Sequence, residues 1–211
     1  MPRPSGKLKV AILASGRGSN LGALIAASAL PGAPFCVAAA ISDNPDVPAL
    51  ARAREAGIEA IAIQRQSFPS KAAFDAALAD AAEKSGAGLI CLAGFMRVLS
   101  PAFLSRFPGG VINVHPSLLP SFPGLDAQKQ ALEHGVKITG CTVHFVDDGV
   151  DTGPIILQAA VPVEPGDTVE LLSSRILAQE HLIYTKAVEM IATGQIPFPH
   201  PGRPLLSKTK E

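Results

Sequence analysis

The chain has 211 residues, 47% of them hydrophobic, and its 18 basic side chains balance 18 acidic ones. This length allows one domain with a sizeable core, and the balanced charge argues against a nucleic-acid-binding surface. No apolar run is long enough to span a bilayer and residues 1–9 lack the apolar part of a secretory signal, so we expect a cytoplasmic protein without membrane or nucleic-acid partners.

Strand and helix patterns alternate over most of the chain. Short, nearly continuous apolar runs are typical of strands buried on both faces of a parallel sheet, and apolar residues at helical spacing lie between them. The predicted strands are residues 8–14, 35–42, 58–63, 89–93 and 111–115. The predicted helices are residues 21–30, 47–56, 71–85, 101–107 and 125–134.

The C-terminal part departs from this alternation. Residues 139–146 and 154–163 are predicted strands, and the short loop between them, 147–153, cannot make a parallel crossover. We therefore expect an antiparallel extension of the sheet. Asp167 is predicted to cap a long final helix over residues 168–192.

These elements predict one α/β domain over residues 1–196, an open twisted and mostly parallel sheet with helices on both faces. The Pro-rich, polar residues 197–211 are predicted to form a flexible tail. In such sheets ligands bind beyond the carboxyl ends of the strands, at the point where the strand order reverses. Residues 15–20, 94–99 and 116–124 are polar or glycine- and proline-marked loops at that rim, and we expect the functional site there.

Asn113 and His115 interrupt the apolar run of the fifth predicted strand. Residues two apart in a strand point to the same face, so the amide and the imidazole project together. A donor amide beside a titratable imidazole suits chemistry at a carbonyl group, where an oxyanion is stabilised and a proton moves. Taken alone, such a pair is more often a strand end whose polar side chains serve a turn.

The turn after the first predicted strand has the composition of a phosphate-binding loop. Gly16 and Gly18 allow the backbone to approach an anion, and Ser19 and Asn20 add donors where the helix begins. With Gly22 the spacing also approaches a dinucleotide-binding fingerprint, for which Asp43 would be the ribose-binding acid. The two side-chain donors favour a terminal phosphate monoester, and a tight turn without a ligand is the third interpretation.

Asp147, Asp148 and Asp151 fall in one loop before the last predicted strand. A solvated turn explains this composition as well as a site does. The functional interpretation requires one of the three beside His115, where a carboxylate would stabilise the charged imidazole.

The cysteines and the other histidines give no sign of a metal site. Cys36, Cys91 and Cys141 lie in apolar runs without CxxC spacing, which is typical of reduced core thiols. His134 and His144 lack metal-ligand spacing, so we expect no metal.

Four segments in this order closely resemble the folate-dependent glycinamide ribonucleotide transformylases. They are GRGSNL (16–21), LAGFMRVLS (92–100), INVHPSLLP (112–120) and GCTVHFVD (140–147), and the resemblance runs from about residue 8 to about 194. It implies a Rossmann-like formyltransferase fold. It also implies direct transfer of formyl from 10-formyltetrahydrofolate, the cosubstrate, to the glycine amine of glycinamide ribonucleotide, through a tetrahedral oxyanion, in purine (IMP) biosynthesis.

The resemblance assigns roles to individual residues. Those that match the catalytic trio of the family are Asn113, His115 and Asp151. Those that match ribonucleotide-binding positions are Gly18, Ser19, Asn20, Pro116, Gly124 and Glu180. Those that match folate-binding positions are Lys71, Met96, Arg97, Val98, Leu99, Asn113, Asp147, Asp148, Gly149, Val150 and Asp151. Relatives carry Arg at position 71, near the folate tail, and Lys keeps the charge without the fork of donors.

Two other functions of the same fold share the Asn–His–Asp chemistry. Methionyl-tRNA formyltransferases add a C-terminal domain and a basic surface, and 10-formyltetrahydrofolate hydrolases add an N-terminal regulatory domain. A NAD-binding module would account for the glycine-rich turn and Asp43 but not for Asn113 and His115. We expect small-molecule substrates and a monomer or homodimer.

Overall fold

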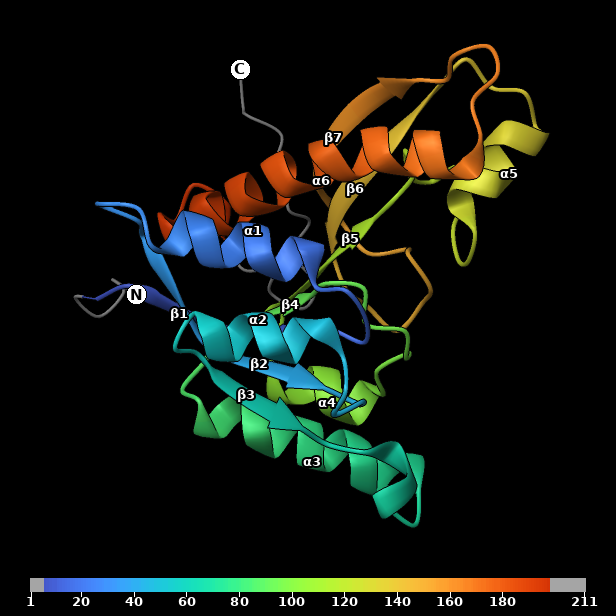
Figure 1. Cartoon of the computed structure of the whole chain (residues 1–211). Helices are drawn as coiled ribbons and strands as arrows, with labels where there is room; N and C mark the ends of the chain where they lie inside the picture. The colour runs from blue at the N-terminus through green and yellow to red at the C-terminus, as the bar shows by residue number, and fades with distance from the viewer. Residues whose placement is uncertain (1–5, 198–211) are drawn as a thin grey trace, which may run out of the picture.

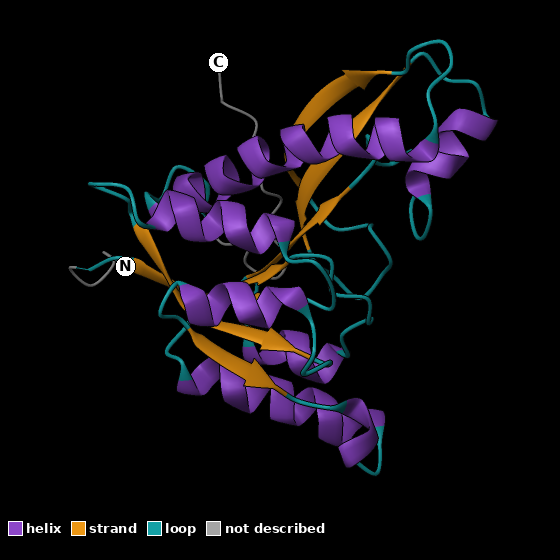
Figure 2. Ribbon diagram, viewed as in Figure 1, coloured by secondary structure: helices purple, strands orange, loops and turns teal. Residues whose placement is uncertain are grey.

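The computed structural model describes residues 6–197, which form one seven-stranded sheet with helices on both sides (Figure 2). The strand order is β3-β2-β1-β4-β5-β6-β7. The strands are β1 (Leu8–Leu13), β2 (Phe35–Ser42), β3 (Glu59–Ala62), β4 (Leu89–Leu92), β5 (Val111–His115), β6 (Ile138–Phe145) and β7 (Ile155–Pro162). The first five are parallel, and β6 and β7 extend the sheet in antiparallel pairs. The predicted fold class is confirmed.

Six α-helices and one short 3-10 turn lie among the described residues and cover the sheet. The helices are α1 (Ser19–Ser28), α2 (Pro48–Glu55), α3 (Lys71–Lys84), α4 (Pro101–Arg106), α5 (Ala127–Glu133) and α6 (Val169–Ala192), and the 3-10 turn is η1 (Arg65–Ser67). Helices α1, α2 and α6 cover one face, and α3 and α4 cover the other (Figure 1). No helix within residues 6–197 is both long and apolar enough to cross a membrane.

The core on each face follows from the alternation of side chains along β1. Val10 and Ile12 pack into the cluster under α1, α2 and α6, whereas Ala11 and Leu13 pack against α3 and α4. Each fully buried large aliphatic side chain contributes about 1.5–3 kcal/mol relative to an exposed one. Both faces of β1 are therefore buried, as its continuous apolar run predicts.

Most element boundaries differ from the prediction by one or two residues, among them the starts of three helices. Helix α1 begins at Ser19, so that Ser19 and Asn20 belong to its first turn. Helix α5 begins only at Ala127, because Asp126 adopts a positive φ of 56°. The cap of α6 is Thr168, whose hydroxyl accepts from the N–H of Leu171.

Asp167, the predicted cap of α6, is instead held by Arg175, whose guanidinium donates to both carboxylate oxygens at 2.7 and 2.9 Å. This ion pair keeps the pKa of Asp167 below its ordinary value. The predicted flexible tail, residues 197–211, lies outside the described residues from position 198 onward.

Gly140 of β6 allows two segments to approach closely. A Cβ at this position would overlap the carbonyl oxygen of Ala159 on β7 and would lie 2.9 Å from Cδ2 of Leu118, in the loop after β5. The missing side chain therefore fixes the distance between the antiparallel extension and a loop at the rim of the sheet.

We expect Gly140→Ala to lower the free energy of unfolding by about 1–3 kcal/mol, the typical cost of overpacking. The matched control is Gly22→Ala in α1, where the nearest atom, Nη1 of Arg52, would lie 3.9 Å from the new Cβ. That variant should gain about 0.5–1 kcal/mol, since alanine is the better helix former. Urea unfolding measures both, and a Gly140→Ala variant as stable as the wild type would contradict the close approach.

Candidate active site

The register of β5 with β6 brings polar side chains together on one face of the sheet. Asn113 lies opposite His144 in the antiparallel pair, and Nδ2 of Asn113 is 3.2 Å from Nε2 of His144. The alternate residues of β5, Ile112 and Val114, point to the other face and pack in the core. As the strand periodicity predicts, Asn113 and His115 therefore point away from that core.

The loop between β6 and β7 places Asp151 against both histidines. One carboxylate oxygen lies 3.2 Å from Nδ1 of His115, and the other lies 3.5 Å from Nε2 of His144. The backbone N–H of Gly124 donates to Asp151 at 2.9 Å. The structure thus brings Asn113, His115 and Asp151 together and adds a fourth side chain, His144.

Both ring nitrogens of His115 face hydrogen-bond acceptors. Nδ1 faces the Asp151 carboxylate, and Nε2 lies 2.8 Å from the backbone carbonyl oxygen of Phe122. Only the imidazolium form carries a hydrogen on each nitrogen and can donate both bonds. His115 is 5% exposed, so its ring is buried with an acceptor on each side.

Asp151 is held ionised by this arrangement. Burial alone raises the pKa of the Asp151 carboxyl, but the His144 hydrogen bond, the Gly124 N–H and the charge of His115 outweigh it and keep that pKa below its ordinary value. The ionised form therefore stabilises the folded chain at neutral pH. That contribution is lost as the pH falls through the lowered pKa.

Sequence reasoning considered His144 only as a metal ligand and missed its place in this site. Its Nδ1 lies 2.9 Å from the carbonyl oxygen of Phe145, which leaves Nε2 for Asn113 and Asp151. The signal that could have found it is the pairing of β5 with β6, because residue 144 then lies opposite residue 113.

The loop over residues 116–124 is fixed to β6 and β7 by buried hydrogen bonds. Thr142 of β6 donates its hydroxyl to the carbonyl of Ser117 at 2.7 Å and accepts from the N–H of Leu119 at 3.0 Å. Gln158 of β7 donates to the carbonyl of Leu119 at 2.9 Å. Pro116 and Gly124, two predicted ribonucleotide-binding positions, begin and end this loop, and Gly124 contacts Asp151 directly.

The glycine-rich turn leads directly into α1. Gly18 precedes the helix with φ 70°, and a Cβ at this position would come within 2.7 Å of Cα of Ala49. Ser19 and Asn20 supply backbone N–H groups of the first helical turn, which have no partner within the helix. This end of α1 can therefore receive an anion.

The Asn20 side chain is engaged in a way that the sequence did not predict. Its Nδ2 donates to the Glu180 carboxylate on α6 at 2.7 Å. Burial raises the pKa of Glu180, and this single hydrogen bond offsets part of the effect. Asn20 therefore orients Glu180, which the family resemblance assigns to binding of the ribonucleotide.

Apart from Asn113 on β5, the predicted folate-binding positions fall into two loops and the start of α3. The side chains of Met96, Arg97 and Val98 are exposed after β4, whereas the Leu99 side chain packs in the core and leaves only its backbone for a ligand. Lys71, at the start of α3, is paired with Asp75 at 2.5 Å.

In the loop after β6, the positions Asp147, Asp148, Gly149 and Val150 are exposed. Asp147 closes this loop by accepting from the N–H of Gly149 at 3.1 Å and the hydroxyl of Thr152 at 2.7 Å. Of the three loop carboxylates, the structure brings only Asp151 to His115.

Asp43, the candidate ribose acid of a dinucleotide site, is already paired. Nε of Arg97 lies 2.5 Å from its carboxylate. This contact joins the loops that follow β2 and β4 and leaves Asp43 less able to bind ribose hydroxyls. The pairing weakens the dinucleotide interpretation of the glycine-rich turn.

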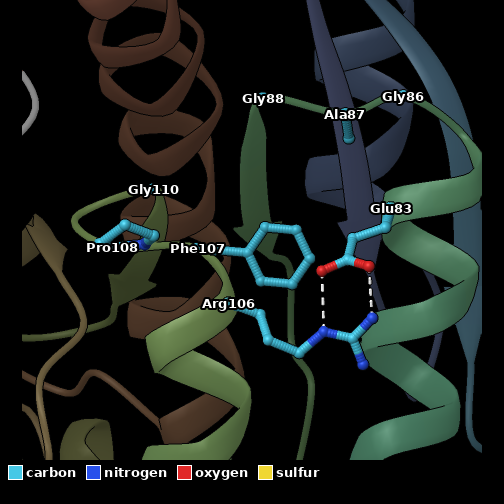
Figure 3. Close-up of a pocket in the computed structure, with 8 residues that line it drawn as sticks. All are labelled: Glu83, Gly86, Ala87, Gly88, Arg106, Phe107, Pro108 and Gly110. Carbon is cyan, nitrogen blue, oxygen red and sulfur yellow. Dashed lines mark hydrogen bonds and ion pairs between the residues drawn. The ribbon is translucent and has the colours of Figure 1, made fainter.

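The hollow in Figure 3 lies at the opposite end of the sheet, where Gly88 precedes β4 and Gly110 precedes β5. It has a volume of about 460 Å³. Its one lining cation, Arg106, is bonded to Glu83 and lies 2.8 Å from Asp80. Because that charge is already neutralised, this hollow offers little to an anionic ligand.

The open parallel sheet, with an amide, an imidazole and a carboxylate at its carboxyl rim, defines an α/β enzyme suited to group transfer at a carbonyl. A sequence model of the formyl transferase family matches residues 8–188. The chain belongs to this family.

Named relatives are similar over most of the chain. The phosphoribosylglycinamide formyltransferase of Escherichia coli (strain K12) is 42% identical over 189 residues, which are 90% of this chain and 89% of that protein. The trifunctional purine biosynthetic protein adenosine-3 of Bos taurus is 46% identical over 197 residues, 93% of this chain. The chain spans only 20% of the length of that protein.

Among solved structures, the crystal structure of glycinamide ribonucleotide transformylase 1 from Symbiobacterium toebii is similar, with a TM-score of 0.91 and 51% sequence identity. The alignment covers 95% of this chain and 94% of that chain. The similarity therefore includes the antiparallel extension as well as the parallel half of the sheet.

Glu180 allows a test of the electrostatics of this rim. Because folding raises its pKa, the ionised carboxylate destabilises the folded chain at pH values above the ordinary carboxyl pKa of about 4.3. Glu180→Gln removes the charge and keeps an oxygen for Asn20. We expect a higher melting temperature at pH 7, by roughly 2–4 °C for each kcal/mol recovered, with a gain that shrinks towards pH 4.

The control is Glu189→Gln on the same helix, whose carboxylate forms a loose ion pair with Lys186 at 3.8 Å. It should change stability by less than about 0.5 kcal/mol. Thermal unfolding followed by circular dichroism at several pH values measures both variants. A Glu180→Gln variant that melts below the wild type at pH 7 would contradict the destabilising charge.

Proposed function

We propose that this chain transfers the formyl group of 10-formyltetrahydrofolate to the glycine amine of glycinamide ribonucleotide and releases tetrahydrofolate, as a step of purine biosynthesis. The observation that carries the proposal is His115, held between two acceptors beside Asn113 at the rim of the sheet. The names of the Escherichia coli relative and of the Symbiobacterium toebii structure support glycinamide ribonucleotide as the substrate that receives the formyl group.

Asn113 and His115 act on the formyl oxygen. The attacking amine nitrogen forms a bond to the formyl carbon, and the bond from that carbon to the folate N10 then breaks. The Asn113 amide and the Nε2–H of His115 stabilise the negative charge on the oxygen between these two events. Since Nε2 donates to the Phe122 carbonyl in this structure, the oxyanion replaces Phe122 as the acceptor.

Asp151 holds His115 charged and moves the proton. The proton leaves the attacking amine, and the Asp151–His115 pair relays it to N10 of the departing folate. His144 positions the pair by contacting both Asn113 and Asp151. The amine itself attacks, so no residue of the chain becomes covalently attached.

The two ends of the rim bind the two substrates. Gly18 and the first-turn N–H groups of Ser19 and Asn20 bind the phosphate, and Glu180 binds the ribose hydroxyls. The pterin lies between the loops 96–99 and 147–151, which contact it largely through backbone groups. The ribonucleotide also contacts Pro116 and Gly124, whose loop is fixed beside Asp151.

The substrate that receives the formyl group separates this proposal from the other functions of the fold. A spectroscopic assay of a 10-formyl folate should show release of the folate product with glycinamide ribonucleotide. It should show little release with water alone or with methionyl-tRNA. Turnover that is fastest with water or with the tRNA would overturn the proposal in favour of a hydrolase or a tRNA formyltransferase. Tight binding of NAD with no response to the ribonucleotide would overturn it in favour of a dinucleotide-binding module.

His115→Ala should lower kcat for formyl transfer by about 10²–10⁴-fold, the usual contribution of a general acid–base group. Binding of the ribonucleotide, measured by calorimetry, should remain close to that of the wild type. Single-turnover kinetics of the same variant tests the chemical step directly. If the variant keeps most of its turnover, the proposed role of the imidazole is wrong.

A further inference from the structure

The loop between β4 and α4 is held at both ends by hydrogen bonds. The N–H of Ser15, which follows β1, donates to the carbonyl of Gly94 at 3.1 Å, and the Ser15 hydroxyl accepts from the N–H of Met96 at 3.1 Å. At the other end, the N–H of Ser100 donates to the Asp75 carboxylate of α3 at 3.1 Å. Both ends of the loop are therefore fixed to elements that are distant in the sequence.

The middle of this loop makes no such backbone bonds. Within residues 6–197, the N–H groups of Arg97, Val98 and Leu99 have no hydrogen-bond acceptor. Three successive backbone donors are thus available to a ligand or to water. The Val98 side chain is 62% exposed, whereas Leu99 packs in the core. The conformation of the segment before Leu99 therefore depends on the side chain of Arg97.

The Arg97 side chain contacts two elements at once. Its Nε donates to Oδ2 of Asp43, after β2, at 2.5 Å, and its guanidinium carbon lies 5.6 Å from the centroid of the Phe74 ring on α3. Because β1 lies between β2 and β4 in the sheet, the ion pair crosses the end of β1. The side chain of Asp43 is 9% exposed and that of Arg97 is 44% exposed, so salt screens this pair less than a pair on the open surface.

Asp43 is a fixed anchor, because the turn that carries it is held on both sides. The Ser42 hydroxyl accepts from the N–H of Asn44 at 3.1 Å, and the side-chain oxygen of Asn44 accepts from the N–H of Asp46 at 3.0 Å. Short polar side chains that bond to nearby backbone groups stabilise such turns. The carboxylate of Asp43 can therefore hold the Arg97 side chain in place.

The same ion pair is a poor stabiliser of the fold. Oδ1, the second carboxylate oxygen of Asp43, is buried and has no hydrogen-bond partner within residues 6–197. A buried polar atom without a partner is destabilising, which offsets much of what the pair contributes. The pair therefore matters more for where it places Arg97 than for the free energy of unfolding.

We propose that Asp43 is a positioning residue that acts through Arg97 and holds the loop 96–99 ready for the formyl donor. This inference rests on the proposed function, which places the pterin against this loop. The free N–H groups of the loop meet the donor, and Asp43 itself does not touch it. A loop that already has its binding conformation loses less conformational freedom when the donor binds, so the ion pair lowers KM for the donor.

Asp43→Ala should raise KM for 10-formyltetrahydrofolate by about five- to thirtyfold, since the donor must then fix the backbone of about one more residue. The Kd of tetrahydrofolate, measured by calorimetry without the ribonucleotide, should rise by the same factor. The values of kcat and of KM for the ribonucleotide should stay close to those of the wild type. A merely structural role would instead lower kcat and raise both KM values together.

A double variant tests whether Asp43 acts through Arg97. Arg97→Ala alone should raise KM for the donor about as much as Asp43→Ala does. In the Arg97→Ala background, Asp43→Ala should have no further effect, because residues that act as one unit are not additive. If the two effects multiply instead, Asp43 does not act through Arg97 and the inference is overturned.

Two further variants separate the ion pair from local charge and from folding. Asp43→Asn keeps an oxygen for Nε of Arg97 without the charge, and it should raise KM for the donor less than Asp43→Ala does. It keeps the inference testable if the alanine variant does not fold. Asp46→Ala removes an exposed carboxylate from the same turn and should keep the KM of the wild type. An equal rise of KM in Asp46→Ala would assign the effect to local charge and overturn the role of the ion pair.

Failure of this inference is distinguishable from failure of the proposed function. If the wild type formylates the ribonucleotide and Asp43→Ala has an unchanged KM for the donor, only the role of Asp43 is overturned. If the wild type binds tetrahydrofolate and Asp43→Ala weakens that binding, the inference stands even where formyl transfer to the ribonucleotide is absent. In that case only the proposed function fails.

Discussion

The hydrogen bonds on the two sides of the His115 ring hold the site together. They join β5 to the loop 116–124 through the Phe122 carbonyl, and to the β6–β7 loop through Asp151. Phe122 and Asp151 both have positive φ angles, 53° and 56°, which cost a non-glycine residue about 1–2 kcal/mol each. The contacts of the Phe122 carbonyl with His115, and of the Asp151 carboxylate with His115, His144 and Gly124, offset this cost.

The rim contains two poorly exposed carboxylates with opposite behaviour. Asp151 accepts from His144 and Gly124 and faces the charge of His115, and its pKa is lowered. Glu180 accepts a side-chain hydrogen bond only from Asn20 among residues 6–197, and burial raises its pKa. A buried charge is stable only where partners replace the lost water. Asp151 has such partners within the protein and needs none from a ligand. Glu180 still lacks donors, which the hydroxyls of a bound ribose would supply.

Local patterns in the sequence predict the fold and, within the site, the pair formed by Asn113 and His115. Apolar runs and helical spacing predict every strand, and the alternation along β5 places Asn113 and His115 on one face. The partners across the sheet depend on register and loop conformation, which no local pattern contains: His144 opposite Asn113, Arg97 against Asp43, and Asp151 rather than Asp147 or Asp148 beside His115. Only the family resemblance selected Asp151. Likewise, Asp167 and Thr168 are both good caps, and Arg175 decides between them.

The balance of charge decides which concavity of this molecule can recognise an anion. Arg106, in the larger hollow, is bonded to Glu83 and paired with Asp80, and it lowers the pKa of Glu83 while its own pKa is raised. A carboxylate ligand would have to displace a partner that is already bound. In a smaller pocket at the rim, of about 350 Å³, Arg65 donates to the backbone carbonyl of Phe68, and a neutral acceptor is more weakly held than a carboxylate. The smaller pocket is therefore the better anion site, because binding there adds an ion pair without breaking one.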